Sequence, residues 1–166
     1  PANYYNEYAL LVRTMQQQKV TPTAIYSVLG GAASSYKFVK EFPEAANGII
    51  DCNHWFNPKD RRAQDLKKRA EAKGLFFSYE MFMTYTAMTL LADALERAKS
   101  TDRAAIIDAL EKSTFANHIM PYGPTKFVAG QNMGAQPLMT QVSKGDIKVI
   151  IPRDYREIDP IFPLKA

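Results

Sequence analysis

AIYSVLGG at 24–31 and GIIDCNHWF at 48–56 are the two stretches that decide the fold class. Each is a short apolar run with β-branched or aromatic residues, flanked by turn formers, which is typical of a buried strand. A short helix is predicted between them at 36–42 and is ended by Pro43, and an amphipathic helix at 3–18 precedes them. The order helix–strand–helix–strand predicts an α/β fold with parallel strands joined by right-handed crossovers.

The middle of the chain is predicted to be helical. A charged helix at 60–73 is followed by FFSYEMFMTYTAMTLLADALERAK at 76–99, which is apolar nearly all round. Charges in mid-bilayer are costly, and Glu80 and Asp93 lie inside this run, so we expect a helix buried in a domain core rather than a membrane span. A further helix is predicted at 103–113.

The last fifty residues change to short β-type runs with frequent Gly and Pro. Lys144-Gly145-Asp146 lies between two of these runs and is a hairpin turn signal. The predicted runs are PTKFVA at 124–129, PLMTQVSKG at 137–145 and DIKVIIP at 146–152.

Composition and charge narrow the class of protein. With 166 residues, 46% of them hydrophobic and 11% aromatic, the chain reads as folded rather than disordered. The single cysteine, Cys52, excludes an internal disulfide framework and a four-cysteine zinc site. Segment 59–73 holds seven Lys and Arg against three Asp and Glu, which accounts for the whole net charge of +4. This segment is either a solvated helix face or a contact for a polyanion, but it carries no nucleic-acid-binding motif.

GGAASS at 30–35 is the first candidate for a binding site. Gly30, Gly31, Ala32 and Ser34 lie between a predicted strand and a predicted helix, where small residues let a ligand approach the backbone. The segment matches neither GxGxxG nor the P-loop pattern, so it does not indicate a nucleotide site. An ordinary tight turn is the alternative.

DCNHW at 51–55 is the second candidate. On a strand, Cys52 and His54 share one face, while Asp51, Asn53 and Trp55 share the other. A Cys–His nucleophile or a metal site would use the first pair, but two strand positions lie about 6–7 Å apart along the axis, which disfavours direct proton transfer. We therefore expect no metal and no cofactor, and we expect Trp55 to line an apolar cleft.

Four segments together resemble the C-terminal half of periplasmic solute-binding proteins of the branched-chain amino acid type, which serve ABC importers. The likeness covers nearly the whole chain. The segments that carry it are AIYSVLGGA at 24–32, EAANGIIDCNHWFNP at 44–58, YEMFMTYTAMTLLADALERAKSTDRAAIIDALEKS at 79–113 and YGPTKFVAGQNMGAQPLMTQVSKGDIKVIIP at 122–152.

The resemblance implies part of a two-lobe type I periplasmic binding fold with a cleft between the lobes. By that likeness, residues 1–58 end lobe two with a hinge strand, residues 59–135 form the helical part of lobe one, and residues 136–166 return to lobe two. The chain is then a fragment, or a half whose complement, the missing N-terminal half, is a separate chain.

The implied function is capture of a small solute in the periplasm, or by a lipid-anchored protein outside the cytoplasmic membrane, and delivery to an ABC permease, without enzymatic chemistry. Amino-acid-binding members carry a carboxylate in the loop after the strand equivalent to 24–29, and here that loop reads LGGAAS. An amine without a counter-charge would be poorly held, so we expect an aromatic or other small organic carboxylate. The residues predicted to bind it are Tyr26, Gly30, Gly31, Ala32, Ser34, Asn53, Trp55 and Tyr79.

Three alternatives remain open from the sequence. The same architecture could serve as the ligand-sensing domain of a receptor or regulator. A Cys–His enzyme would show turnover that depends on Cys52, and a nucleic-acid binder would lose affinity steeply with salt.

Overall fold

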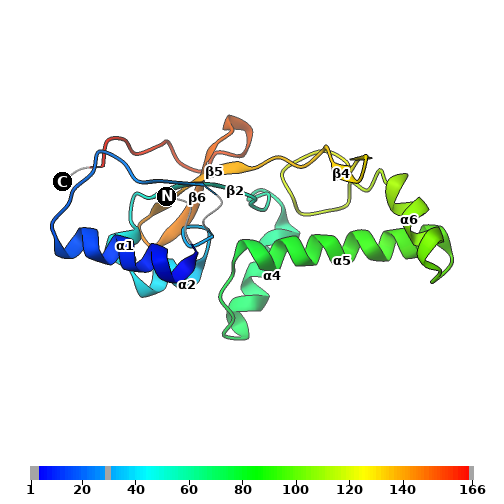
Figure 1. Cartoon of the computed structure of the whole chain (residues 1–166), viewed down its shortest axis with the longest axis horizontal. Helices are drawn as coiled ribbons and strands as arrows, with labels where there is room; N and C mark the ends of the chain where they lie inside the picture. Colours follow the sequence, from blue (N-terminus) through cyan, green and yellow to red (C-terminus); the bar gives the residue numbers. More distant parts are fainter. Residues whose placement is uncertain (1–3, 29–30, 165–166) are drawn as a thin grey trace.

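The computed structural model describes residues 4–28 and 31–164 of the chain. The molecule is elongated (Figure 1). One end is built on a β-sheet, and we call it the sheet end. The other end is built on the long helix α5 (Tyr79–Ala98), and we call it the helix end.

The sheet has four strands in the order β1-β2-β5-β6. β1 (Tyr26–Val28) and β2 (Ile50–Asn53) are parallel, as the sequence predicts for an α/β fold. β5 (Leu138–Ser143) runs antiparallel to β2 and forms a hairpin with β6 (Asp146–Ile151). The predicted hairpin turn is confirmed, because Lys144 and Gly145 both have positive φ, at 53° and 78°, as a two-residue turn of this hand requires.

Three helices accompany the sheet: α1 (Tyr5–Gln17), α2 (Tyr36–Glu41) and α3 (Pro43–Ala46). Tyr8 and Phe38 from these helices share one buried cluster with Val142 and Val149 from the hairpin. Pro43 ends α2 as predicted. The sequence did not predict that Pro43 also begins a helix, a role for which its fixed φ and missing N–H suit it.

The helix end contains α4 (Arg61–Ala72), α5, α6 (Arg103–Glu111) and the small ladder of β3 (Phe127–Val128) and β4 (Gln131–Asn132). The expectation that α5 is buried in a core is wrong for this chain. Only three of its twenty residues are buried: Phe82, Thr86 and Ala94. Among the described residues, no helix has the length and apolar character needed to cross a membrane.

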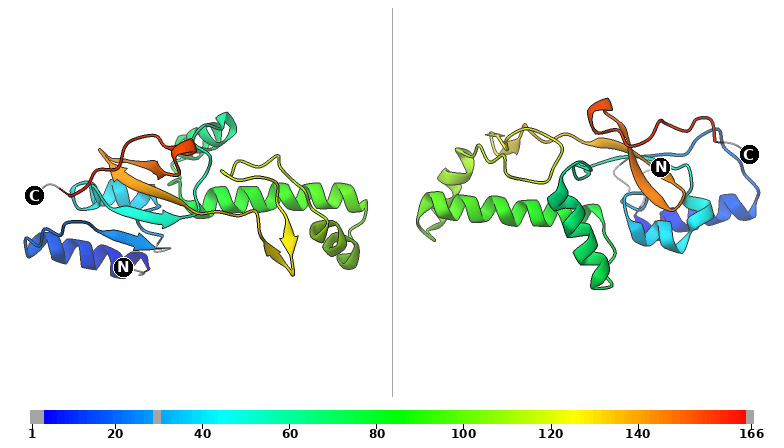
Figure 2. Two further views of the ribbon diagram at one scale, coloured as in Figure 1. Left: turned by 90° about the horizontal axis from the view of Figure 1, so that it is seen from above. Right: turned by 180° about the vertical axis from the view of Figure 1, so that it is seen from behind.

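Two chain crossings join the ends, one between β2 and α4 and one between β4 and β5 (Figure 2). A cluster of four buried rings also lies at the junction and links the end of β2 to the start of α5. Its members are Trp55, Phe56, Phe77 and Phe82, with ring centroids 5.2–5.7 Å apart. The assignment of the two ends to lobes of a larger protein, with boundaries near residues 58 and 135, stays a prediction.

Candidate ligand-binding site

The loop between β1 and α2 packs directly against the first residue of α5. Gly31 has φ +70°, and a Cβ built there would lie 3.0 Å from Cε1 of Tyr79. A side chain would therefore be both strained and obstructed, so the position requires glycine. The structure thus brings together two predicted site residues that are 48 positions apart in the sequence. Gly30 lies outside the described residues.

Backbone contacts fix this loop to the segment that leads into α5. Ser35 forms an isolated antiparallel bridge with Ser78, and the Tyr36 N–H donates to the Phe77 carbonyl at 3.1 Å. Ala32, within the loop, is buried. The loop therefore lies at the junction of the sheet end and the helix end, where movement of one end against the other would change its surroundings.

Buried polar groups from β2 lie behind the loop. The Ser34 hydroxyl donates to Oδ2 of Asp51, and both side chains are fully buried. Asn53 lies on the same face of β2 as Asp51 and accepts the N–H of His54 at 2.8 Å through its Oδ1. Within the described parts of the chain, Oδ1 of Asp51 and Nδ2 of Asn53 have no hydrogen-bond partner. These atoms retain capacity to bind a polar group or a water.

Asp51 is a further candidate site residue, which was not among the residues predicted to bind a ligand. The loop itself contains no carboxylate, but this carboxylate lies on the next strand and is held against the loop by Ser34. Burial, and after it the neighbouring Glu80, raise the pKa of the Tyr79 phenol, and Asp51 adds to the rise. Tyr79 therefore stays a neutral hydroxyl near neutral pH. The signal for Asp51 in the sequence is its place on the same strand face as the predicted site residues Asn53 and Trp55.

Two predicted residues have other surroundings. Trp55 is completely buried among Phe56, Phe82 and Tyr36. It therefore does not form the expected wall of an open cleft in this structure. Tyr26 is 44% exposed on the face of β1 opposite to buried Ser27, so its ring does not share a face with the buried groups behind the loop.

The Cys–His alternative gains no support from the geometry. Cys52 lies within the sheet, paired in register with Val28 and Met139, while His54 lines a 290 Å³ cavity beside α5 with Met83 and Thr86. No cluster of three or more His, Cys, Asp or Glu that could hold a metal ion occurs in the residues that the structure describes.

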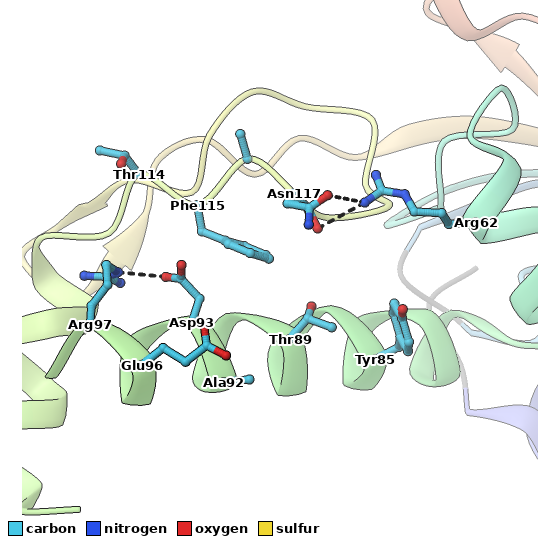
Figure 3. Close-up of a pocket in the computed structure, with 11 residues that line it drawn as sticks. Arg62, Tyr85, Thr89, Ala92, Asp93, Glu96, Arg97, Thr114, Phe115 and Asn117 are labelled. Carbon is cyan, nitrogen blue, oxygen red and sulfur yellow. Dashed lines mark hydrogen bonds and ion pairs between the residues drawn. The ribbon is translucent and has the colours of Figure 1, made fainter. Parts of the chain in front are cut away.

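A larger cavity of 680 Å³ lies along α5, away from the loop (Figure 3). Segment 114–117 faces α5 across it, and Phe115 points between them. Charged side chains border the space: Arg97 pairs with Asp93 at 2.9 Å, and Arg62 donates to Asn117. No sequence motif predicted this cavity. The helix that lines this cavity, α5, also exposes the side chains of Met83, Tyr85 and Met88, so much of its apolar surface is uncovered.

The α/β sheet, the long helix and the loop at their junction define part of a type I periplasmic binding fold. The family model described as periplasmic binding protein matches residues 2–146, and the chain belongs to this family.

Solved structures share the fold. The chain is similar to the leucine-binding protein LivK of Thermotoga maritima, with a TM-score of 0.70, 22% identity and 89% of this chain covered. It is also similar to LivJ of Streptococcus pneumoniae in complex with isoleucine, with a TM-score of 0.70, 20% identity and 90% covered. A branched-chain amino acid ABC transporter protein from Thermus thermophilus with bound valine gives a TM-score of 0.65, 13% identity and 98% covered.

The chain spans less than half the length of these structures, at 41%, 43% and 46% respectively. No curated protein sequence matches it.

Proposed function

We propose that this chain is part of a solute-binding protein that captures a small molecule outside the cytoplasmic membrane and delivers it to an ABC permease. The observation that carries this proposal is the loop at 31–36, which is held by Gly31 and Tyr36 against the start of α5 at the junction of the two ends. Family membership supports the location and the class of partner. No bond of the solute is made or broken.

Binding at this junction would act through hinge closure. The loop and the start of α5 are already joined by backbone contacts, so the contacts that depend on closure are those a ligand makes at once with this junction and with the opposing lobe of the family's two-lobe fold. A ligand shifts a conformational equilibrium by its difference in affinity for the two states, so such contacts favour the closed state.

A small aromatic or other organic carboxylate is the ligand class that we propose. The loop consists of small residues and contains no acidic residue, so it suits an anionic group better than an ammonium. The neutral hydroxyl of Tyr79 adds a hydrogen-bond donor at the same place.

A standard amino acid is the second candidate, and Asp51 favours it. Its buried carboxylate lies directly behind Ser34 and has one oxygen without a partner in the described structure. If the loop shifts by opening around Gly31, this charge could face the ammonium of an amino acid. Two of the solved structures to which this chain is similar hold isoleucine and valine, which supports this candidate.

The rest of the fold would complete the site. The chain spans 41–46% of the matched structures, and Tyr85 and Met88 on α5 are exposed. We infer that the missing half of the protein packs on this face of α5 and supplies the remaining ligand contacts.

A thermal-shift screen of the full-length parent protein tests the proposal. The panel contains the twenty amino acids, aromatic carboxylates and short-chain carboxylates. A ligand at one hundred times its Kd adds about 2.7 kcal/mol of stability, which is easily detected. The absence of a shift with every compound would contradict the proposal.

Two variants of the parent protein separate the ligand classes. Asp51→Asn keeps an acceptor for Ser34 but removes the charge, while Asp93→Asn removes a charge on α5 and serves as the control. An amino-acid ligand should lose its shift in Asp51→Asn only. A carboxylate ligand should keep its shift in both variants.

A further inference from the structure

One cluster of charged and aromatic side chains connects three elements from both ends of the molecule, and neither the sequence analysis nor the proposed site uses it. Lys67 comes from α4, Tyr36 is the first residue of α2, and Asp146 is the first residue of β6. The Tyr36 hydroxyl donates to Asp146 and accepts from Nζ of Lys67 at 2.6 Å. The same ammonium lies 3.5 Å from Oδ1 of Asp146 and 4.0 Å from the centroid of the Tyr36 ring.

The cluster is partly shielded from water, which strengthens its contacts. The Lys67 side chain is 19% exposed, and Tyr36 is buried. Burial and the neighbouring Asp146 carboxylate raise the pKa of Tyr36, so its hydroxyl keeps its proton. Hydrogen bonds to charged partners are stronger than those between neutral groups. The contacts among Lys67, Tyr36 and Asp146 can therefore contribute more to stability than an exposed ion pair does.

Tyr36 is held at two points by the segment 61–78. Its side chain is bound by Lys67 of α4, and its N–H is bound by the carbonyl of Phe77, just before α5. The residue directly before it, Ser35, bridges to Ser78. The end of the loop is therefore bonded both to α4 and to the segment that leads into α5.

We propose that Lys67 is a positioning residue for the candidate ligand loop, acting through the Tyr36 hydroxyl so that α4 and the loop move together. This inference rests on the proposed function for its consequence, because a loop coupled to α4 would sense the position of the helix end during closure. The coupling itself needs no ligand.

Removal of Lys67 should leave a folded chain. Asp146 retains Lys148 at 2.8 Å, and Lys148 also pairs with Glu157 at 3.4 Å. Lys67→Met keeps the apolar stem and removes only the ammonium. Lys68→Met is the matched control, because Lys68 is the next residue, is exposed, and has no hydrogen bond, ion pair or ring contact among the described residues.

Amide hydrogen exchange of the 166-residue chain, followed by NMR, tests the proposal. The Tyr36 amide should exchange about tenfold faster in Lys67→Met than in Lys68→Met, the size expected for one charge-assisted hydrogen bond. The Val142 amide, which bonds to Ile49 within the sheet, should exchange at the same rate in both variants. Lys67→Arg, which keeps a cation and donors, should restore most of the Tyr36 protection.

Three results would overturn the proposal. Equal exchange of Tyr36 in the two Met variants would show that Lys67 does not act on the loop. Equal acceleration of Tyr36 and Val142 would show general destabilisation instead of positioning. Additive effects of Lys67→Met and Tyr36→Phe would show that Lys67 does not act through the hydroxyl. Because no ligand is present, failure here leaves the ligand screen unaffected, and a negative screen leaves this coupling intact.

Discussion

The two ends of the molecule differ in how much apolar surface they bury by themselves. At the sheet end, helices and strands share a core in which Tyr8, Phe38, Ile49 and Val149 are completely inaccessible. At the helix end, the twenty-residue α5 has three buried residues, and α6 has only Ala109. Since burial of apolar surface is the main favourable term in folding, the sheet end carries most of the stability of the chain.

The difference is also visible along α5 itself. Two of the three buried residues of α5, Phe82 and Thr86, lie in its first two turns, close to the aromatic cluster at the junction. Beyond them, Met88 is 60% exposed. The outer part of α5 therefore opens more easily than the sheet, in keeping with local unfolding of weakly packed regions.

Truncation of a core ring at the sheet end should give the largest effect. Phe38 packs edge-on against Tyr8 at 5.4 Å and is completely buried, so Phe38→Ala should lower the free energy of unfolding by about 3–5 kcal/mol. Met88→Ala at the helix end should change it by less than about 0.5 kcal/mol. Urea unfolding followed by circular dichroism and by fluorescence of Trp55, the single tryptophan, measures both. Similar losses in the two variants would show that the ends are equally packed.

The second-largest effect should come from high pH, which should lower the stability of the sheet end. Burial raises the pKa of Tyr8 to about 12 from an ordinary value of 10.0, and burial also raises the pKa of Tyr5 and Tyr36. The folded state disfavours the phenolate, so this stability is complete below pH 10 and is lost as the pH rises towards 12. Two pKa units correspond to about 2.7 kcal/mol for Tyr8 alone.

Urea midpoints measured between about pH 8 and 11.5 check this dependence. Tyr8→Phe should be less sensitive to alkali than the parent chain, because it removes one phenol from the buried set. An alkaline slope unchanged by Tyr8→Phe would mean that Tyr8 does not titrate differently in the folded state.

The sequence predicted the elements well where the signals are local. The Lys144-Gly145 turn and the apolar runs that form β1 and β2 each depend on a few neighbouring residues. The exposure of α5 could not be predicted, because an apolar helix gives the same pattern whether or not its partners are present.

The candidate site was predicted only in part for the same reason. The loop at 31–34 and Tyr79 were identified, but their contact depends on how two distant segments pack. Asp51 lies 17 residues from Ser34, and Asp146 lies 110 residues from Tyr36, so no local pattern could link them. The burial of Trp55 follows from α5 crossing the end of β2, which also needs the tertiary structure.

The smallest predicted effect separates the two ends most directly. Asp102 caps α6 by accepting the N–H groups of Ala104 and Ala105 at 3.0 and 3.1 Å. Loss of such a cap costs about 1 kcal/mol. Because α6 buries only Ala109, we expect Asp102→Ala to speed exchange of the α6 amides about fivefold while leaving the Val142 amide unchanged. If Val142 also exchanges faster by the same factor, α6 and the sheet unfold together, and the helix end is cooperative with the core in spite of its exposed surface.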